Sequence, residues 1–184
     1  TRLKYVLIGE SGIGKTSIMV RYVKKEFTNV YRSTIGCSFL AKQLEIGNDR
    51  YCLDIWDSAG QERYLSLLPM YYRDADIIFI CFNLENNFSS ITKTIKFWQN
   101  ELQNYNDNTN RVIYLVGTKD DLITDERSAQ VKRFIQQNFQ QYPFTETSAK
   151  NNDHVEFIFH NSLQLYVTKS RIIEEERKRE ESKN

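Results

Sequence analysis

The sequence predicts an α/β fold: a mostly parallel β-sheet with helices on both faces. Strand-like runs of apolar and β-branched residues alternate along the chain with stretches whose apolar residues recur at helical spacing. The runs at 77–82 and 112–116 are continuously apolar, as strands buried on both faces are. Runs 37–46 and 50–56 are separated only by Gly47-Asn48-Asp49, which predicts a hairpin and one antiparallel edge strand.

Length and charge place the chain among ordinary globular domains. Its 184 residues are enough for one domain with a substantial core. Lys and Arg number 25 and Asp and Glu 24, so a net charge of +1 gives no general attraction to nucleic acid. Cys37, Cys52 and Cys81 lie in apolar runs, which favours buried thiols over disulfides. No signal peptide or membrane-length apolar run is present in the sequence.

The first half of the chain begins with an apolar, β-branched strand at 3–8, followed by a helix at about 15–25. The stretch at 29–36 is polar without a clear period, and we interpret it as a mobile loop. The hairpin strands follow, and a short helix is expected at about 65–72.

The second half continues the alternation of strands and helices. A helix at 90–105 is amphipathic, with Ile91, Ile95, Trp98, Leu102 and Tyr105 on one face. After a polar loop at 106–110 and the strand at 112–116, we expect a helix at 128–139, a short strand at 144–147 and a helix from about residue 153. We place the domain at 1–167 and interpret the charged stretch 168–184 as a solvated extension of the last helix.

Residues 9–16, Gly-Glu-Ser-Gly-Ile-Gly-Lys-Thr, match the phosphate-binding pattern G-x-x-x-x-G-K-[ST]. They lie between an expected strand and an expected helix, the context that the motif needs. Glycines let successive backbone N–H groups point at phosphate oxygens, and the helix adds its positive N-terminal end. We expect Lys15 to reach the β- and γ-phosphates and Thr16 to ligate Mg²⁺.

Two further stretches predict the metal site and the hydrolytic site. The Thr34 hydroxyl is placed to be a second Mg²⁺ ligand, and Asp57 lies at the end of a strand, where an acid can balance the charge of the metal. Gly60 can bring its N–H close to the γ-phosphate, and Gln61 can orient an attacking water. Taken alone, Asp57-Ser58-Ala59-Gly60 is equally typical of an ordinary turn after a strand.

The base is predicted from two stretches that follow strands. Asp121, in Gly117-Thr118-Lys119-Asp120-Asp121, can accept hydrogen bonds from both N1–H and the exocyclic amine of guanine. Adenine offers neither donor at that edge, so the carboxylate would be buried without partners. The stem of Lys119 and the ring of Phe27 can cover the two sides of the nucleoside, and the Ala149 N–H can donate to guanine O6.

The motifs GESGIGKT, STIG, WDSAGQE, GTKDDL and ETSAK together resemble the Ras superfamily of small GTPases, over nearly the whole domain. YRSTIGCSF, IWDSAGQERY and SLLPMYYRDAD resemble its Rab family, and GESGIGKTS its early-endosomal members. The resemblance implies a P-loop NTPase three-layer fold with a six-stranded sheet and five helices. Thr118 departs from the pattern, because most Rab proteins carry Asn there, and Asn83 replaces a usual acid.

The resemblance also implies a binding site and a catalytic set. The catalytic residues would be Gln61, Lys15 and Gly60, and the metal ligands Thr16, Thr34 and Asp57. The residues expected to bind GTP or GDP are Ser11, Gly12, Ile13, Gly14, Lys15, Thr16, Ser17, Phe27, Thr34, Gly60, Thr118, Lys119, Asp121, Leu122, Ser148, Ala149 and Lys150.

The function implied is a GTP-hydrolysing switch that regulates vesicle traffic on the cytosolic face of endosomal or other vesicle membranes. Residues 31–39 and 60–73 would change between the GTP and GDP states, and Phe39, Trp56 and Tyr71 would form the effector surface. The partners implied are effectors, a guanine nucleotide exchange factor, a GTPase-activating protein and a GDP dissociation inhibitor. We expect a monomer that binds no nucleic acid and a membrane contact through a lipid anchor absent from this chain.

Two alternatives stay open on the residues alone. A nucleotide kinase also uses a phosphate-binding loop, but it needs a substrate lid and has no reason to carry Gly60-Gln61 together with Thr118-Lys119-Asp120-Asp121. A binding module that holds GTP without hydrolysing it is the second alternative. Gln61 argues against it, and single-turnover hydrolysis would decide.

Overall fold

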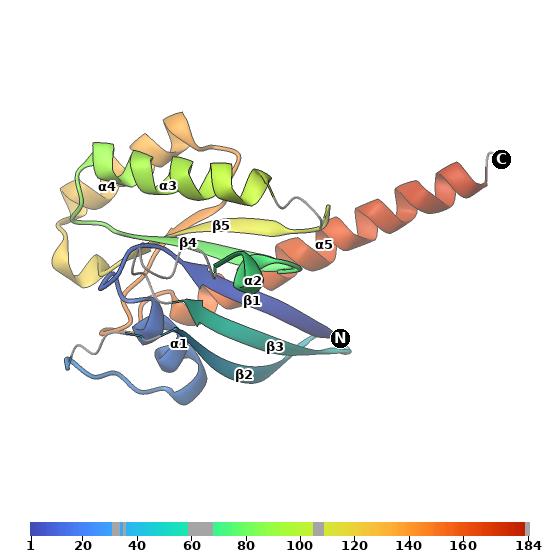
Figure 1. Cartoon of the computed structure of the whole chain (residues 1–184), viewed down its shortest axis with the longest axis horizontal. Coiled ribbons are helices and arrows are strands. Elements are labelled where there is room, and N and C mark those ends of the chain that lie inside the picture. Colours follow the sequence, from blue (N-terminus) through green and yellow to red (C-terminus); the bar gives the residue numbers. More distant parts are fainter. Residues whose placement is uncertain (31–33, 35, 59–67, 105–108, 183–184) are drawn as a thin grey trace.

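The computed structural model describes residues 1–30, 34, 36–58, 68–104 and 109–182. Its centre is one six-stranded sheet, with the strands in the order β2-β3-β1-β4-β5-β6 (Figure 1). The strands are β1 (Arg2–Ile8), β2 (Cys37–Ile46), β3 (Asp49–Ser58), β4 (Ile77–Asn83), β5 (Val112–Thr118) and β6 (Phe144–Glu146).

The pairing of the strands confirms the predicted sheet. β1 pairs in parallel with β3 and β4, β4 with β5, and β5 with β6, whereas β2 and β3 are antiparallel. Ile46 pairs with Asp49 across a two-residue turn, and Gly47 adopts a φ of +60° there. That left-handed conformation carries no Cβ penalty for glycine, so the tight hairpin forms where the sequence predicts it.

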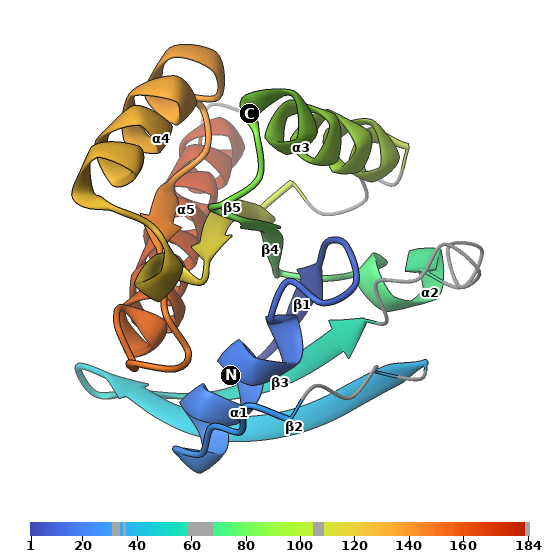
Figure 2. The same cartoon turned by 90° about the vertical axis from the view of Figure 1, so that its left-hand side faces the viewer.

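Helices cover both faces of the sheet, as Figure 2 shows. α1 (Lys15–Lys24) and α5 (Val155–Glu181) lie on one face, where Tyr22 and Phe159 stack with ring centroids 3.8 Å apart. α2 (Leu68–Tyr72), α3 (Phe88–Gln103) and α4 (Asp125–Asn138) lie on the other. On α3, the apolar stripe Ile91, Ile95, Trp98 and Leu102 is buried as predicted, whereas Tyr105 lies outside the described residues. The predicted α/β fold with five helices is confirmed.

The ends of several helices differ from the sequence prediction because of capping. α4 begins three residues earlier than expected, since the Thr124 hydroxyl accepts a hydrogen bond from the Arg127 N–H at 3.2 Å. α3 also begins early, where the Asn87 side chain accepts from the Ser90 N–H at 2.8 Å. The first three residues of the expected helix at 65–72, half of the loop at 29–36 and most of the loop at 106–110 lie outside the described residues.

The last helix is longer than the folded body that it packs on. α5 continues without a break to Glu181 and extends beyond the sheet (Figure 1). Its final turns carry the ion pairs Lys178–Glu174 and Arg177–Glu181, both at the spacing expected for a solvated helix. The division into a domain at 1–167 and a charged extension stays a prediction. Within the described part of the chain, no helix has the length and apolar character required to cross a membrane.

Candidate functional site

One cavity of about 530 Å³ lies where β1, β3 and β5 end, at the N-terminal end of α1. In open parallel sheets this edge is where ligands bind, because the loops that leave the strands gather there. The residues that line it are Ser11, Gly12, Ile13, Gly14, Lys15, Thr16, Ser17, Ile18, Val20, Glu26, Phe27, Thr28, Asn29, Val30, Thr34, Ser58, Thr118, Lys119, Asp121, Leu122, Ala149 and Lys150.

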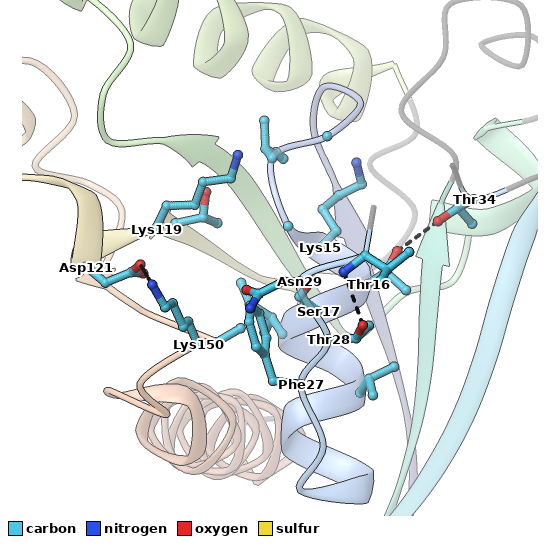
Figure 3. A pocket seen from close by; sticks show the side chains of 18 of the residues that line it. Lys15, Thr16, Ser17, Phe27, Thr28, Asn29, Thr34, Lys119, Asp121 and Lys150 are labelled. Carbon is cyan, nitrogen blue, oxygen red and sulfur yellow. Dashed lines mark hydrogen bonds and ion pairs between the residues drawn. The ribbon is translucent and has the colours of Figure 1, made fainter. Parts of the chain in front are cut away.

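The predicted phosphate-binding loop forms one end of the cavity. Gly9 adopts a φ of +145°, and a Cβ there would lie 2.4 Å from the Cys81 carbonyl oxygen, so only glycine fits. The loop bends around the Lys15 side chain, whose Nζ donates to the carbonyls of Gly9 at 2.9 Å and Glu10 at 2.7 Å. Lys15 is thereby fixed at the cavity wall (Figure 3).

α1 starts at this end of the cavity. Gly14, at its N-cap, has a φ of +103°, and no side chain among the described residues caps the helix there. The first N–H groups of a helix have no intrahelical partners, and the helix dipole makes them attractive to anions. The loop, Lys15 and α1 therefore form a surface suited to phosphate.

Three oxygen-bearing side chains meet beside Lys15. The Thr16 and Thr34 hydroxyl oxygens lie 2.8 Å apart, and both contact Asp57 Oδ2, Thr16 as a close donor and Thr34 at 3.4 Å. The Asp57 side chain is fully buried, and its Oδ1 has no hydrogen-bond partner among the residues that the structure describes. The predicted metal ligands are therefore brought together, although Asp57 stands behind the lining residues.

The electrostatics of Asp57 fit a cation at this point. Burial raises the pKa of the Asp57 carboxyl, while the Thr16 hydroxyl, the Lys15 ammonium and the Thr34 hydroxyl act in the opposite direction. A buried carboxylate with one unpartnered oxygen and two neighbouring hydroxyls is a set of hard oxygen donors, which Mg²⁺ prefers. No cluster of three His, Cys, Asp or Glu side chains that could hold a metal occurs in the described ranges, so this mixed set is the candidate.

Asp121 marks the opposite end of the cavity (Figure 3). Its Oδ1 accepts from the Ser148 hydroxyl at 2.6 Å, and its Oδ2 lies 3.9 Å from Lys150 Nζ. Ser148 in turn accepts from the Asn151 N–H at 3.0 Å, which fixes the hydroxyl toward Asp121. The predicted base-binding residues thus support one another, and Ser148 lies behind Asp121 rather than in the lining.

Backbone contacts hold the two base-binding loops together. The Asp120 N–H donates to the Thr147 carbonyl at 3.0 Å, and the Thr147 N–H donates to the Gly117 carbonyl at 2.7 Å. Thr118 is buried, and its hydroxyl donates to the Phe82 carbonyl at 3.1 Å. Threonine therefore finds a partner at the position where Rab proteins usually carry Asn.

The segment after Phe27 also lines the cavity, although only Phe27 was predicted there. Thr28, Asn29 and Val30 lie along the wall between the base end and Thr34. Their position between Phe27 and Thr34 could have indicated this, because the backbone must connect these two predicted contacts. Gly60 and Gln61, by contrast, lie outside the described residues, and their catalytic roles stay predictions.

An aromatic patch lies on the outer surface of the hairpin. The Trp56 ring is 4.9 Å from that of Phe39 and 6.3 Å from that of Tyr71, measured between centroids. Phe39 is 44% exposed, and Trp56 and Tyr71 are half-buried. The three aromatics predicted to act together therefore form one continuous, accessible surface.

Comparison with known proteins agrees with this fold. A model of the Ras family matches residues 4–167. Ras-related protein Rab5A of Oryza sativa subsp. japonica is 38% identical over 159 residues, which cover 85% of this chain and 76% of the relative. Ras-related protein RABF2a of Arabidopsis thaliana is 40% identical over 157 residues, with coverage of 85% and 77%. Ras-related protein Rab-7a of Dictyostelium discoideum is 37% identical over 162 residues, with coverage of 85% and 78%. The predicted resemblance is confirmed, and the chain belongs to the Ras family of small GTPases.

Proposed function

We propose that this GTPase is a nucleotide-controlled switch of vesicle traffic that reads guanine through Asp121 and releases or recruits partners through its aromatic patch. The observation that carries the proposal is the continuity of the cavity. One space of about 530 Å³ has Lys15 and the phosphate-binding loop at one end and Asp121 at the other, as a nucleoside triphosphate requires.

Guanine is favoured by the chemistry of the base end. The Asp121 carboxylate offers acceptors, and Ser148 and Lys150 use only part of its capacity. Guanine presents two donors to the remaining acceptor capacity of this group, whereas adenine would leave that capacity buried and unused. Phe27 and the stem of Lys119 would cover the base, and the Ala149 N–H would donate to O6.

At the phosphate end, Lys15 and the N-terminal end of α1 would bind the β- and γ-phosphates. Thr16, Thr34 and Asp57 would hold Mg²⁺, which when bound supplies positive charge beside the phosphates. Gly60 and Gln61 would complete the site, the first through its N–H and the second by orienting water. Hydrolysis in this class is slow unaided, and an arginine supplied by a partner accelerates it by about 10³–10⁵-fold. We therefore include a GTPase-activating protein among the partners.

The γ-phosphate would tie Thr34 and Gly60 to the nucleotide, and hydrolysis would remove both ties. Phe39, Trp56 and Tyr71 adjoin these segments, so effectors that bind them would distinguish the two states. By analogy with its Rab relatives, we place the monomeric protein on the cytosolic face of endosomal or other vesicle membranes, held by a lipid anchor. An exchange factor and a GDP dissociation inhibitor would complete its cycle.

A binding and turnover experiment tests this proposal. We expect GTP and GDP to displace a fluorescent guanine nucleotide at concentrations at which ATP does not, with tighter binding in Mg²⁺ than in chelator. Single-turnover measurement should then detect conversion of bound GTP to GDP. An affinity for ATP equal to that for GTP, or a GTP affinity that is the same in Mg²⁺ and in chelator, would contradict the proposal. Capture of effectors should depend on GTP and be lost in Trp56→Ala, whose nucleotide affinity should stay unchanged.

A further inference from the structure

Arg21 connects two walls of the base end from behind the cavity. Its side chain extends from α1 and donates Nε to the Ala149 carbonyl at 2.6 Å and Nη2 to the Lys150 carbonyl at 3.0 Å. These acceptors are 128 and 129 residues away in the sequence. Nη1 donates to the Lys25 carbonyl at 3.1 Å, at the end of its own helix. One guanidinium therefore joins α1 to the loop that carries Ala149.

The same guanidinium also lies against Phe27. Its central carbon is 5.6 Å from the centroid of the Phe27 ring, within the range of a cation–π contact. Phe27 and Ala149 both line the cavity, whereas Arg21 lies outside the lining. The two residues expected to touch the base from different sides thus share one support.

The contacts of Arg21 require a planar group with several donors. Guanidinium carries five N–H donors in a fixed fork and stays charged at any physiological pH. A lysine at this position could reach one carbonyl but could not satisfy three at once. The hydrogen bonds fix the two peptide groups that follow the Ala149 and Lys150 α-carbons, and so they hold in place the backbone that directly follows the Ala149 N–H.

We propose that Arg21 is a positioning residue for guanine. It holds the loop that carries the Ala149 N–H beside O6 and supports Phe27 against the base, and it thereby slows nucleotide release. This inference rests on the proposed function, which assigns this end of the cavity to guanine. It assigns to Arg21 a role in specificity, because the support given to Ala149 matters only for a base that carries O6.

The test compares two nucleotides in three variants. GDP carries O6, whereas 2-aminopurine riboside diphosphate keeps the exocyclic amine, has hydrogen in place of O6 and lacks the N1–H. Each variant is compared with the unaltered protein on the same nucleotide, so the lost N1–H contact is common to both measurements. Arg21→Gln should speed GDP release by about tenfold and release of the 2-aminopurine nucleotide by no more than about threefold. Arg21→Lys should fall between Arg21→Gln and the unaltered protein. Lys24→Gln removes a charge from the last turn of the same helix at an exposed position and should change neither rate.

The outcomes separate this inference from the function on which it rests. If the unaltered protein prefers GDP to ADP but Arg21→Gln releases GDP at the unaltered rate, the positioning role alone is wrong. The same holds if both nucleotides leave faster by one common factor, because the O6 contact would then contribute nothing, whereas loss of support for Phe27 would affect both nucleotides equally. If the unaltered protein does not prefer GDP to ADP, both the inference and the proposed function fail. Arg21→Lys supplies the same comparison should Arg21→Gln not fold.

Discussion

Replacing Asp121 with Asn should convert the guanine site into a xanthine site. The substitution keeps the shape of the side chain and exchanges one oxygen for an amide. Asp121 Oδ1 accepts from the Ser148 hydroxyl at 2.6 Å, and an amide oxygen can accept the same bond. The new amide nitrogen then takes the place of Oδ2, which lies 3.9 Å from Lys150 Nζ. The hydrogen bond to Ser148 should therefore survive, while the long ion pair with Lys150 is lost and the pattern facing the base changes.

The size of the change in preference follows from two contacts, one lost with guanine and one gained with xanthine. With guanine, one base donor would face the new amide donor, whereas xanthine carries a carbonyl there that can accept. The Asp121 side chain is only 11% exposed, so water can do little to relieve a mismatch. Each buried mismatch costs about 1–3 kcal/mol. Losing one contact with guanine and gaining one with xanthine should shift the preference by about 2–6 kcal/mol, or roughly 30-fold to 10⁴-fold.

Competition against a fluorescent guanine nucleotide measures this shift directly, with GTP and xanthosine triphosphate as competitors. The matched control is Asp120→Asn, the same chemical change one residue earlier, at a side chain that is half-buried and outside the cavity lining. Hydrolysis of bound xanthosine triphosphate should survive, because the phosphate end is unaltered. If Asp121→Asn still prefers GTP, or if Asp120→Asn changes the preference equally, Asp121 does not read the base.

Four further substitutions test other parts of the site. Gln61→Leu should keep nucleotide affinity and slow single-turnover hydrolysis, because only the positioning of water is lost; an unchanged rate would remove Gln61 from the mechanism. Lys15→Ala and Thr16→Asn should both weaken GTP binding, but only Thr16→Asn should make nucleotide release insensitive to chelator; a Thr16→Asn protein as Mg²⁺-responsive as the unaltered one would show that Thr16 is not a ligand. Gly9→Ala places a Cβ 2.4 Å from the Cys81 carbonyl oxygen and should lower the free energy of unfolding by about 2–6 kcal/mol, a fall in melting temperature of roughly 5–20 °C. Its control, Gly47→Ala, has nothing within 4 Å of the added Cβ and should cost about 1–2 kcal/mol, and equal melting temperatures for the two would refute the steric argument.

The parts of the fold that depend on local pattern were predictable from the sequence. β2 runs from Cys37 to Ile46 as expected, because alternation and the Gly47 turn define both its ends and its register. The start of α4 was not predictable in this way, because the buried apolar residues of this helix begin only at Val131, well after the Thr124 cap. Helix ends are decided by single hydrogen bonds, which leave little trace in a periodic pattern.

The candidate site likewise contains residues that the sequence predicts and residues that only the tertiary structure shows. Lys15, Thr16, Asp57 and Asp121 could be named because motif spacing and the ends of strands indicate them. Arg21 could not, since its acceptors are backbone carbonyls that any residue carries, far away in the sequence. The placement of Ser148 behind Asp121 likewise needed the tertiary structure, because only there does its hydroxyl meet the carboxylate.

Asp57 and Trp56 are consecutive residues of β3, so their side chains point to opposite faces of the sheet. Asp57 is buried beside Thr16 and Thr34, whereas Trp56 lies between Phe39 and Tyr71. If the nucleotide in the cavity changes the affinity of a partner for the Trp56 surface, the partner must, by thermodynamic reciprocity, change the affinity for the nucleotide by the same factor. Binding of an effector would then slow the release of nucleotide. This coupling could be measured in two ways. One is the affinity of the partner for each nucleotide state, and the other is the residence time of the nucleotide with the partner bound.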